Sequence, residues 1–378
     1  MTYKIELRDF PVKETYVYLD WRYKNFLLEN SIKKFGSQRL LAEYLDSKLN
    51  WRKLKQTTIS SWLKADNLRL DVIYELCKTL NVNLNEKKIM GLKGAQTSIM
   101  VFNPKLPIIL NASLSGLIAN LYCDGSIDEN NSFTSEYINT CKELREQIKK
   151  YFLNSVGKPA YFSEKEYKFK HKKNVGKVRI PSFVIKALNK KFKLNDDKIP
   201  KPIINSNNKI KSFYLRSVFD DEGTVHKEHG QIKLKMKPRS YVNDVKAILE
   251  ENFHIKCSEI ALELKQDKKY YYFTISGQYN LRRFYNLVGF THPKKLERLK
   301  RRLSSYKENN YGYGARNYVL NVLEKSPKTA DQIAKIIKRD KRTIQHHLNN
   351  LKKDSLISST KIKRKFVYEY LWSLKNEI

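Results

Sequence analysis

Apolar residues recur at helical spacing along the first 95 residues of the chain. This pattern predicts helices over about 24–34, from 38 to the mid-40s, over 57–64 and over about 70–80, and Ser37 is a natural N-cap for the second. The segment 96–110 contains Pro104 and Pro107, which is typical of a linker. We therefore expect an all-α domain over residues 1–95, followed by a linker.

The short helix 57–64 gives this first domain a candidate function. Its place in the series resembles the helix-turn-helix of phage-repressor-type regulators, in which the short middle helix enters the major groove. The side chains that this resemblance turns toward DNA are Thr57, Thr58, Ser60 and Ser61. The preceding segment, 46–56, is longer than the usual tight turn, so a plain helical packing module is the alternative.

The middle of the chain carries one order of elements twice. The first set has candidate strands at 126–128, 132–137, 160–164 and 177–180, with helices at about 140–153 and 182–192. The second set has strands at 224–226, 231–237, 259–265 and 270–276, with helices at about 240–252 and 278–288. A last basic helix covers about 293–306. Matching order and spacing indicate an internal duplication over residues 111–308 and an α+β fold.

The last region, 315–378, predicts three helices and a hairpin. The helices begin near Val319, at the N-cap Thr329 and after Asp340, and the strands 356–362 and 365–372 alternate in hydropathy. This order resembles a winged helix, whose third helix reads a groove while the hairpin tip contacts phosphates. The side chains assigned to those two contacts are Lys341, Arg342, Thr343, Gln345, Lys363 and Arg364.

The net charge of the chain indicates which class of molecule it binds. The 378 residues include 74 Lys+Arg against 39 Asp+Glu, a net charge of +35, which favours a polyanion such as nucleic acid. An anionic membrane is the alternative, but no apolar run approaches the roughly 18–20 residues that span a bilayer, and the N-terminus lacks a signal-peptide segment. We expect a cytoplasmic, nucleoid-associated protein without membrane contact. The four cysteines form no CxxC pair, which argues against zinc fingers and disulfides.

Two short stretches, Leu117–Gly125 and Leu215–Gly223, share a pattern 98 positions apart, from 124 to 222. Each is an apolar helical stretch that ends in an acid followed by glycine. Small residues four apart allow two helices to cross closely. The side chains expected at that contact are Ala119, Cys123, Ser217 and Asp221, the last of which needs a partner for its charge. Asp124 and Glu222 would then meet at the helix ends, where a divalent cation relieves their repulsion.

The two stretches resemble the LAGLIDADG motif of homing endonucleases in the single-chain, two-motif form. The segments 273–281, 288–290 and 293–295 are similar to the closing part of that family. The resemblance implies antiparallel saddle sheets related by a pseudo-twofold axis, and a monomer that binds double-stranded DNA. It also implies Mg²⁺-dependent cleavage of both strands, with Asp124 and Glu222 as catalytic acids and metal ligands.

The family also places a basic or amide side chain near the attacking water. The late-strand positions where we expect it hold Ile180 and Ile275, and neither is basic. Lys233, Lys235 and Lys265 are the candidate substitutes, and they are also candidate DNA contacts because they alternate with apolar residues along their strands.

Three functions stay open. The first is a free-standing endonuclease, since position 1 holds no splicing nucleophile and the chain does not end in His-Asn. The second is a DNA-binding regulator, because some regulators couple a LAGLIDADG-like domain without catalytic acids to a helix-turn-helix. The third is an RNA maturase that uses the same basic scaffold. The presence of both acids favours the nuclease.

Overall fold

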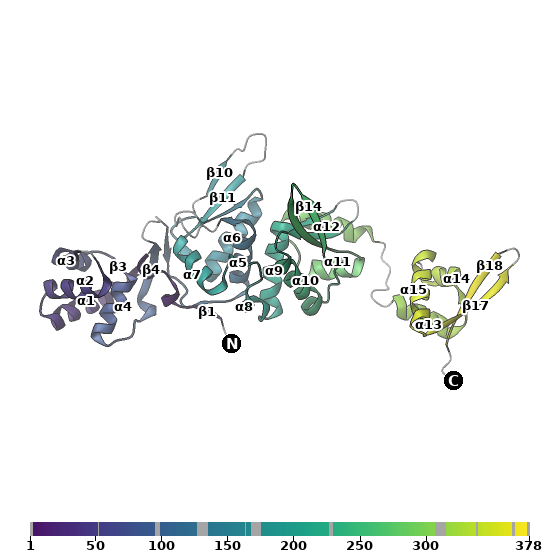
Figure 1. Ribbon diagram of the computed structural model, residues 1–378, viewed down its shortest axis with the longest axis horizontal. Coiled ribbons are helices and arrows are strands. Elements are labelled where there is room, and N and C mark those ends of the chain that lie inside the picture. Colours follow the sequence, from purple (N-terminus) through teal and green to yellow (C-terminus); the bar gives the residue numbers. More distant parts are fainter. Residues whose placement is uncertain are drawn as a thin grey trace. The chain divides into compact units, whose positions relative to one another are not determined.

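The computed structural model describes residues 3–51, 53–94, 99–126, 135–162, 164–167, 175–226, 230–306, 315–337, 339–364 and 367–375. The chain divides into two compact units, Met1–Lys300 and Arg301–Ile378. Both units contain helices and strands, which confirms the α+β class (Figure 1). Within the described part of the chain, no helix combines the length and the apolar character needed to cross a bilayer.

The N-terminal helices lie where the hydrophobic pattern predicts them. They are α1 (Trp21–Phe35), α2 (Gln38–Leu49), α3 (Gln56–Lys64) and α4 (Leu70–Leu80). Ser37 caps α2 by accepting a hydrogen bond from the Leu40 amide at 3.2 Å, as expected. Lys24 is buried in α1 and donates to the carbonyls of Leu63 and Ala65, so it satisfies the C-terminal end of α3.

The prediction that this region is all-α is wrong. An antiparallel sheet runs in the order β3-β2-β4-β5-β9, from β2 (Thr15–Leu19), β3 (Asn67–Arg69), β4 (Ile89–Gly94), β5 (Met100–Phe102) and β9 (Lys158–Pro159). The helical periodicity hid these strands because each is short and pairs with residues distant in sequence. Two short 3-10 turns, η1 (Leu7–Asp9) and η2 (Glu86–Lys88), accompany the sheet.

The segment expected as a linker is also structured. It supplies β5 and β6 (Ile108–Ile109), and β6 pairs with β1 (Lys4–Ile5). Val101 and Ile108 are fully buried or nearly so, which explains why this proline-containing stretch is held in place.

The internal duplication is confirmed by strand order. The first repeat contains α5 (Ala112–Asp124), β7 (Gly125–Ser126), β8 (Ser135–Asn139), α6 (Lys142–Ser155), β10 (Glu164–Tyr167), β11 (Val175–Ile180) and α7 (Ser182–Phe192). The second contains α9 (Asn208–Glu222), β12 (Gly223–Val225), β13 (Ile232–Met236), α10 (Arg239–Phe253), β14 (Ala261–Lys265), β15 (Lys268–Ile275) and α11 (Gln278–Leu287). The sheets run β10-β11-β8-β7 and β14-β15-β13-β12, so corresponding strands occupy corresponding places.

Most expected strands of the repeats lie within about two residues of the observed ones, but the strand expected at 160–164 is displaced. β9 ends at Pro159 and joins the N-terminal sheet, and the outer strand β10 starts at Glu164. The expected strand positions 127–128 and 132–134 lie outside the described residues. Two helices follow the repeats, the short α8 (Lys201–Ile204) and the basic α12 (Pro293–Ser305).

The motif helices α5 and α9 lie side by side at the junction of the two repeats (Figure 1). Ala119 and Ser217 are completely buried, so the expected small contact residues allow the close approach. The Ser115 hydroxyl donates to the Ile210 carbonyl across the contact at 2.9 Å. This packing brings the C-terminal ends of both helices together.

The second unit has the element order expected of a winged helix. It contains α13 (Ala315–Lys325), β16 (Lys328–Thr329), α14 (Ala330–Ile337), α15 (Lys341–Lys353), β17 (Ile357–Arg364) and β18 (Val367–Leu374), with the sheet order β16-β18-β17. Thr329 caps α14 through the Gln332 amide at 3.3 Å, and the Gln332 side chain accepts from the Thr329 amide at 2.9 Å. Val319, Ile333 and Leu348 form its core with Trp372.

Candidate functional site

The two acids predicted to be catalytic end the two motif helices. Asp124 is the last residue of α5 and Glu222 the last of α9. Burial, followed by the charge of Asp124, raises the pKa of Glu222 to about 7. The structure therefore brings these two acids within electrostatic reach of each other in a partly desolvated place.

The glycines after the acids do not form a left-handed turn. Gly125 and Gly223 are extended, with φ of −85° and −75°. A Cβ at Gly125 would lie 2.1 Å from the Leu121 carbonyl oxygen, and one at Gly223 would lie 2.5 Å from the Phe219 carbonyl oxygen. Glycine is required because the chain turns back against its own helix end, where no side chain fits.

Asp124 is held in a polar network. The Asn139 side-chain amide on β8 donates to its Oδ2 at 2.8 Å. Burial raises the pKa of Asp124, while Asn139 and the positive charge of Lys295 act against that rise. Asn139 therefore positions the Asp124 carboxylate from one side. The nearby positive charge of Lys295 does not compensate fully for the burial of this carboxylate.

Asp221, the unusual charge in the helix contact, has the partners that it needs. Its carboxylate accepts hydrogen bonds from Asn120 at 2.8 Å and from the Tyr137 hydroxyl at 2.7 Å. Burial, and then the charge of Asp124, raises its pKa well above the ordinary value, so the neutral form is favoured. Cys123, its counterpart on α5, is half-buried, and burial raises the pKa of its thiol.

Lys295 is the functional residue that the sequence prediction missed. It lies in the first turn of α12, and its Nζ donates to the carbonyls of Phe219 at 3.1 Å and Asp221 at 3.4 Å, as well as to that of Asp220. Burial lowers the pKa of Lys295, while the four acids at the helix ends act to keep it charged. It offsets the negative end of the α9 dipole where the acids gather.

The positions expected to carry a basic partner do not serve the site. Ile180 and Ile275 are buried core residues, 3% and 0% exposed. The only sequence signal for Lys295 was its place directly after the last helix of the second repeat, in the segment Pro293-Lys294-Lys295. Recognising it requires knowing that α12 turns back onto the end of α9.

Asp220 is a buried acid near the end of α9. It is 1% exposed and accepts hydrogen bonds from the Thr291 and His292 amides at 2.9 Å. Burial raises its pKa to about 6. Gln147 of α6 donates to the Thr291 hydroxyl at 2.8 Å. Asp220 therefore fixes the segment that delivers Lys295, and that segment also touches the first repeat.

The lysines of the second sheet form ion pairs within their own sheet. Ile232 and Leu234 are completely buried, and Met236 almost so, while Lys233 and Lys235 face the other side. Both pair with Glu263, at 2.7 and 2.8 Å, and these bonds lower the pKa of Glu263 to about 2. Among the described residues, neither lysine contacts Asp124 or Glu222, and the exposed Lys265 ends β14.

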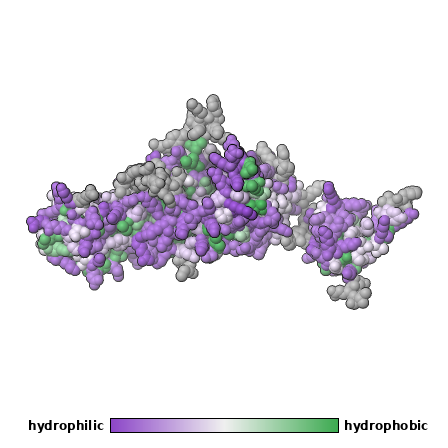
Figure 2. All heavy atoms as spheres, in the orientation of Figure 1, coloured by the Kyte–Doolittle hydropathy of each residue, from purple (hydrophilic) through white to green (hydrophobic). Residues whose placement is uncertain are grey.

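The first sheet repeats this ion-pair pattern with different residues. Glu136 pairs with Lys177 at 3.0 Å and with Arg179 at 3.1 Å, on the face opposite the buried Tyr137. Leu262 and Leu264 are 51% and 67% exposed, so these apolar side chains of the outer strand β14 lie outside the core. Hydrophilic residues cover most of the face shown in Figure 2.

The candidate DNA-facing residues of α3 lie on its open side. Ile59 and Trp62 point inward, Thr57 and Ser61 are exposed, and Thr58 and Ser60 are half-buried. The Ser60 hydroxyl donates to the Gln38 side chain at 2.6 Å, which ties the helix to α2.

The C-terminal candidates belong to α15 and the hairpin. Arg342 and Lys363 are exposed. Some of the others have local partners, since Lys341 pairs with Asp331 at 2.7 Å and Gln345 bonds Asn349 at 3.1 Å. Thr343 bonds the N-cap Asp340 at 3.2 Å. The Arg364 side chain lies outside the described residues.

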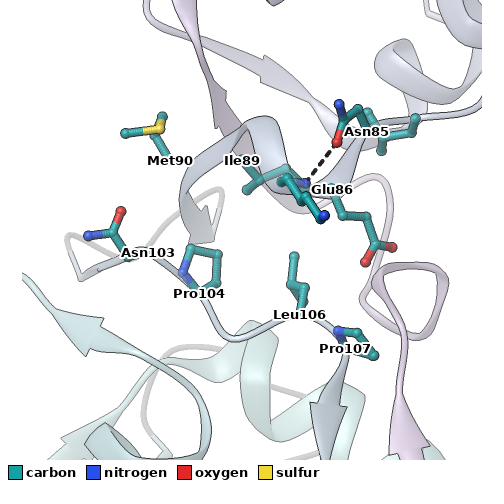
Figure 3. A pocket seen from close by; sticks show the side chains of 10 residues that line it. Asn85, Glu86, Ile89, Met90, Asn103, Pro104, Leu106 and Pro107 are labelled. Atoms are coloured by element: carbon teal, nitrogen blue, oxygen red, sulfur yellow. Dashed lines mark hydrogen bonds between the residues drawn. The ribbon is translucent and has the colours of Figure 1, made fainter.

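A cavity of about 560 Å³ lies elsewhere in the first unit. Figure 3 shows its lining, in which Asn85, Glu86, Ile89 and Met90 face Asn103, Pro104, Leu106 and Pro107. None of the candidate site residues lines it. The chemistry of the helix ends is therefore separate from this cavity.

A metal ion at the helix ends would have Asp124 and Glu222 as its protein ligands. Within the described ranges, no group of three or more His, Cys, Asp or Glu side chains is arranged to hold a metal. Asp124 and Glu222 nevertheless form a carboxylate pair whose pKa values are raised by burial, which a divalent cation with several waters fits.

Comparisons with known proteins agree with this architecture. Residues 209–289 match the family described as LAGLIDADG-like domain, and residues 314–359 match bacterial regulatory protein, arsR family. Over 123 residues the chain is 27% identical to a glutamine–fructose-6-phosphate aminotransferase (isomerizing) of Methanocaldococcus jannaschii, across 32% of this chain. The match spans only 11% of that curated relative.

Two kinds of protein are found among the similar solved structures, a WhiA protein and a homing endonuclease. Full-length DUF199/WhiA from Thermatoga maritima aligns over 64% of this chain and 90% of its own, with 12% identity and a TM-score of 0.36. The homing endonuclease I-WcaI bound to its DNA recognition sequence aligns over 50% and 87%, with 20% identity and a TM-score of 0.35. The two family matches confirm the resemblance expected from the paired motifs: the chain contains a LAGLIDADG-like domain followed by a helix-turn-helix domain that matches the arsR family.

Proposed function

We propose that this protein is a site-specific endonuclease of the homing type that cuts both strands of double-stranded DNA with Mg²⁺. The observation that carries the proposal is the meeting of Asp124 and Glu222 at the ends of two packed helices, where each carboxylate has a raised pKa. Two buried carboxylates whose pKa values stay raised despite the nearby charge of Lys295 are well suited to a shared cation.

The reaction is the hydrolysis of a phosphodiester. The oxygen of water bonds to phosphorus, one P–O ester bond breaks, and the leaving sugar oxygen takes up a proton, which gives a hydroxyl end and a phosphate end. Asn139 holds Asp124 in place, and Lys295 adds fixed positive charge beside both acids. Mg²⁺, when bound by Asp124 and Glu222, would supply Lewis acidity toward the phosphate.

Double-stranded DNA is the partner that the charges support. The net charge is +35, and the basic residues include ordered pairs on both sheets, Lys177 with Arg179 and Lys233 with Lys235. Each pair is held by one glutamate on the face away from the helices, which is where a duplex has access. The helices α3 and α15 would add groove contacts at other points of the same site.

The nuclease proposal predicts that loss of either acid removes cutting and keeps binding. Asp124→Asn and Glu222→Gln should lower the cleavage rate at least about a hundredfold, because the charge that supports the metal is lost. The assay incubates the protein with the DNA that flanks its own gene, with and without Mg²⁺, and measures cleavage on gels and binding by gel shift.

The matched control is Glu259→Gln, since the Glu259 side chain is 97% exposed. It should cut like the natural protein. If the variants at 124 and 222 lose binding as severely as cutting, the two acids are structural and the nuclease proposal is wrong.

The second candidate function is a DNA-binding regulator. The specific observation in its favour is the match of residues 314–359 to the arsR family of regulatory proteins. In that case the same DNA would be protected in a footprint without any break, and Mg²⁺ would change nothing. The two outcomes separate the candidates in one experiment.

A further inference from the structure

The N-terminal sheet has one face that belongs to the core. Val17 of β2 pairs with Leu68 of β3 and with Leu92 of β4, and all three side chains are buried. In an antiparallel sheet, directly paired residues share a face, and neighbours along a strand point to opposite faces. The residues that flank these three along their strands therefore form a second face of the sheet.

A row of paired residues crosses this second face from β3 to β9. Its members are directly opposite one another on neighbouring strands: Asn67, Tyr18, Gly91, Phe102 and Lys158. Tyr18 and Phe102 lie two strands apart, a separation of about 10 Å. Between them Gly91 has no side chain, and a Cβ there would lie 2.2 Å from the Met100 methyl carbon. The strands that carry the two aromatic rings are thus separated by a low apolar surface.

This row lies along a groove of about 790 Å³ within the first unit. The apolar part of its lining includes Tyr18, Met90, Met100 and Phe102. Met90 is 50% exposed and Phe102 is 38% exposed. The register of β2 against β4 shifts after Tyr18, so Met90 is an extra residue of β4 at this point. The groove therefore presents aromatic and methionine side chains to solvent.

Two lysines next to these rings are available for a partner. Lys158 lines the groove and lies directly opposite Phe102. Lys93 lies directly opposite Met100. Within the part of the chain that the structure describes, neither lysine forms an ion pair or a side-chain hydrogen bond. Lysines without an internal partner, next to exposed aromatic rings, suit a nucleic acid whose bases stack and whose phosphates need cations.

An aromatic groove suits unpaired nucleotides better than a duplex. In a duplex the faces of the bases are stacked on one another, so that only their edges are open in the grooves. Unpaired bases have free faces, and stacking of these faces on aromatic side chains is the usual contact in proteins that bind single strands. Tyr18 and Phe102 offer two such rings on one sheet face.

The polar part of the lining favours RNA over DNA. Asp66 and Asn103 line the same groove, and both side chains have oxygen acceptors. A carboxylate beside phosphates is unfavourable unless a donor bonds to it. The 2′-hydroxyl of RNA is such a donor, and DNA lacks it.

We propose that this groove binds single-stranded RNA, with bases stacked on Tyr18 and Phe102 and with phosphates bound by Lys93 and Lys158. The inference goes beyond the nuclease function and does not depend on it, because none of the residues at the ends of α5 and α9 lines the groove. It gives the N-terminal sheet a ligand that differs from the double-stranded DNA proposed for the central domain.

The test compares three labelled ligands of the full-length protein. They are an oligouridine and an oligodeoxyuridine of about ten nucleotides, and a duplex of mixed sequence. Binding is measured by fluorescence anisotropy at about 200 mM salt, where non-specific attraction to a basic chain is weak. We expect the RNA strand to bind about tenfold more tightly than the DNA strand. Asp66→Ala should reduce that ratio toward one.

Variants of the two rings locate the binding site. Tyr18→Ala and Phe102→Ala should each weaken binding of the RNA strand about tenfold, because each removes one stacking contact. Tyr18→Phe keeps the ring and should bind like the natural protein. The matched control Tyr285→Ala removes a tyrosine of α11 that is 36% exposed, and it should bind the RNA strand unchanged. Duplex binding should be the same in all four variants, which checks that they are folded.

The lysines are tested through the salt dependence of RNA binding. Lys158→Gln and Lys93→Gln should each lower the steepness of log affinity against log salt by about 0.7, the value for one phosphate contact of a single strand. The matched control Lys87→Gln, at an exposed position, should leave the steepness unchanged.

The same measurements show how the proposal fails. RNA binding that is unchanged in Tyr18→Ala and Phe102→Ala, or that weakens by the same factor as duplex binding, overturns the groove as the binding site. Equal or tighter binding of the deoxyuridine strand overturns RNA as its ligand. Neither result bears on the nuclease proposal, which is tested by cutting in the variants of Asp124 and Glu222.

Discussion

At the scale of single residues, the site depends on side chains other than Asp124 and Glu222. Asp220 and Lys295 are 75 positions apart in the chain, yet they hold the same helix end, one through backbone amides and the other through backbone carbonyls. Each compensates for the other, because a buried acid and a buried lysine are both costly alone. This pair joins the start of α12 to the end of α9, next to Glu222.

Asp220 should make stability depend on pH. Its pKa is about 6 in the folded protein against an ordinary 3.8, so the folded state binds its proton more tightly. The preference for protonated Asp220 stabilises the folded protein fully below about pH 4. This contribution to the free energy of unfolding, roughly 3 kcal/mol at most, is lost as the pH rises through about 6. Urea unfolding of the natural protein and of Asp220→Asn between pH 4 and 7 measures this.

In that comparison Asp220→Asn should lack this part of the pH dependence, because its amide still accepts the two backbone bonds and does not titrate. The control Glu259→Gln should behave like the natural protein. Parallel pH profiles for the natural protein and Asp220→Asn would contradict the assignment.

Residue roles were predictable where they depend on local sequence. Ser37 and Thr329 cap helices as expected, because a cap is decided within three or four residues. Asp220, Asp221 and Glu222 are consecutive acids, and no local rule says which of them faces a partner. Asp220 is buried only because α12 packs there, a contact between distant segments that spacing does not reveal.

At the scale of elements, the two motif helices end in a turn that excludes side chains. A Cβ at Gly125 would meet the Leu121 carbonyl, Cα and carbonyl carbon within 2.8 Å, all of them backbone atoms that cannot rotate away. The turn that starts β7 therefore requires glycine for close approach, with φ in the ordinary negative region.

Gly125→Ala should destabilise the protein by about 1–3 kcal/mol, because the clash forces the end of α5 or β7 to shift. Chemical denaturation measures the loss, and cleavage should fall as well because Asp124 precedes the shifted bond. The control Ala261→Gly, at the start of an outer strand, should cost less. A stability equal to that of the natural protein would show that the turn tolerates a side chain.

Elements with strong periodicity were predictable, and short paired ones were not. The helix expected at 182–192 has those bounds in the structure, since its apolar face recurs over three turns. The N-terminal sheet was missed because its strands pair across distant sequence: β5, of three residues, lies between β4 and the two-residue strand β9.

At the scale of the whole molecule, a duplicated central domain is combined with helix-turn-helix elements. The repeats share strand order, while their helix ends differ in charge, so the domain has paired architecture and unequal chemistry. Such a protein suits an asymmetric DNA site, since a single chain can vary each half independently. The basic surplus is spread along the chain, which suits contacts with phosphates over a long stretch of duplex.

The central claim is that Asp124 and Glu222 share one divalent cation. The most direct measurement is an anomalous difference map from crystals of the protein bound to a selected duplex in Mn²⁺, which stands in for Mg²⁺. We predict a peak within coordination distance of oxygens from both carboxylates, and its loss in Glu222→Gln crystals. A map with no peak between the two side chains, or a peak held by other residues, would contradict the claim.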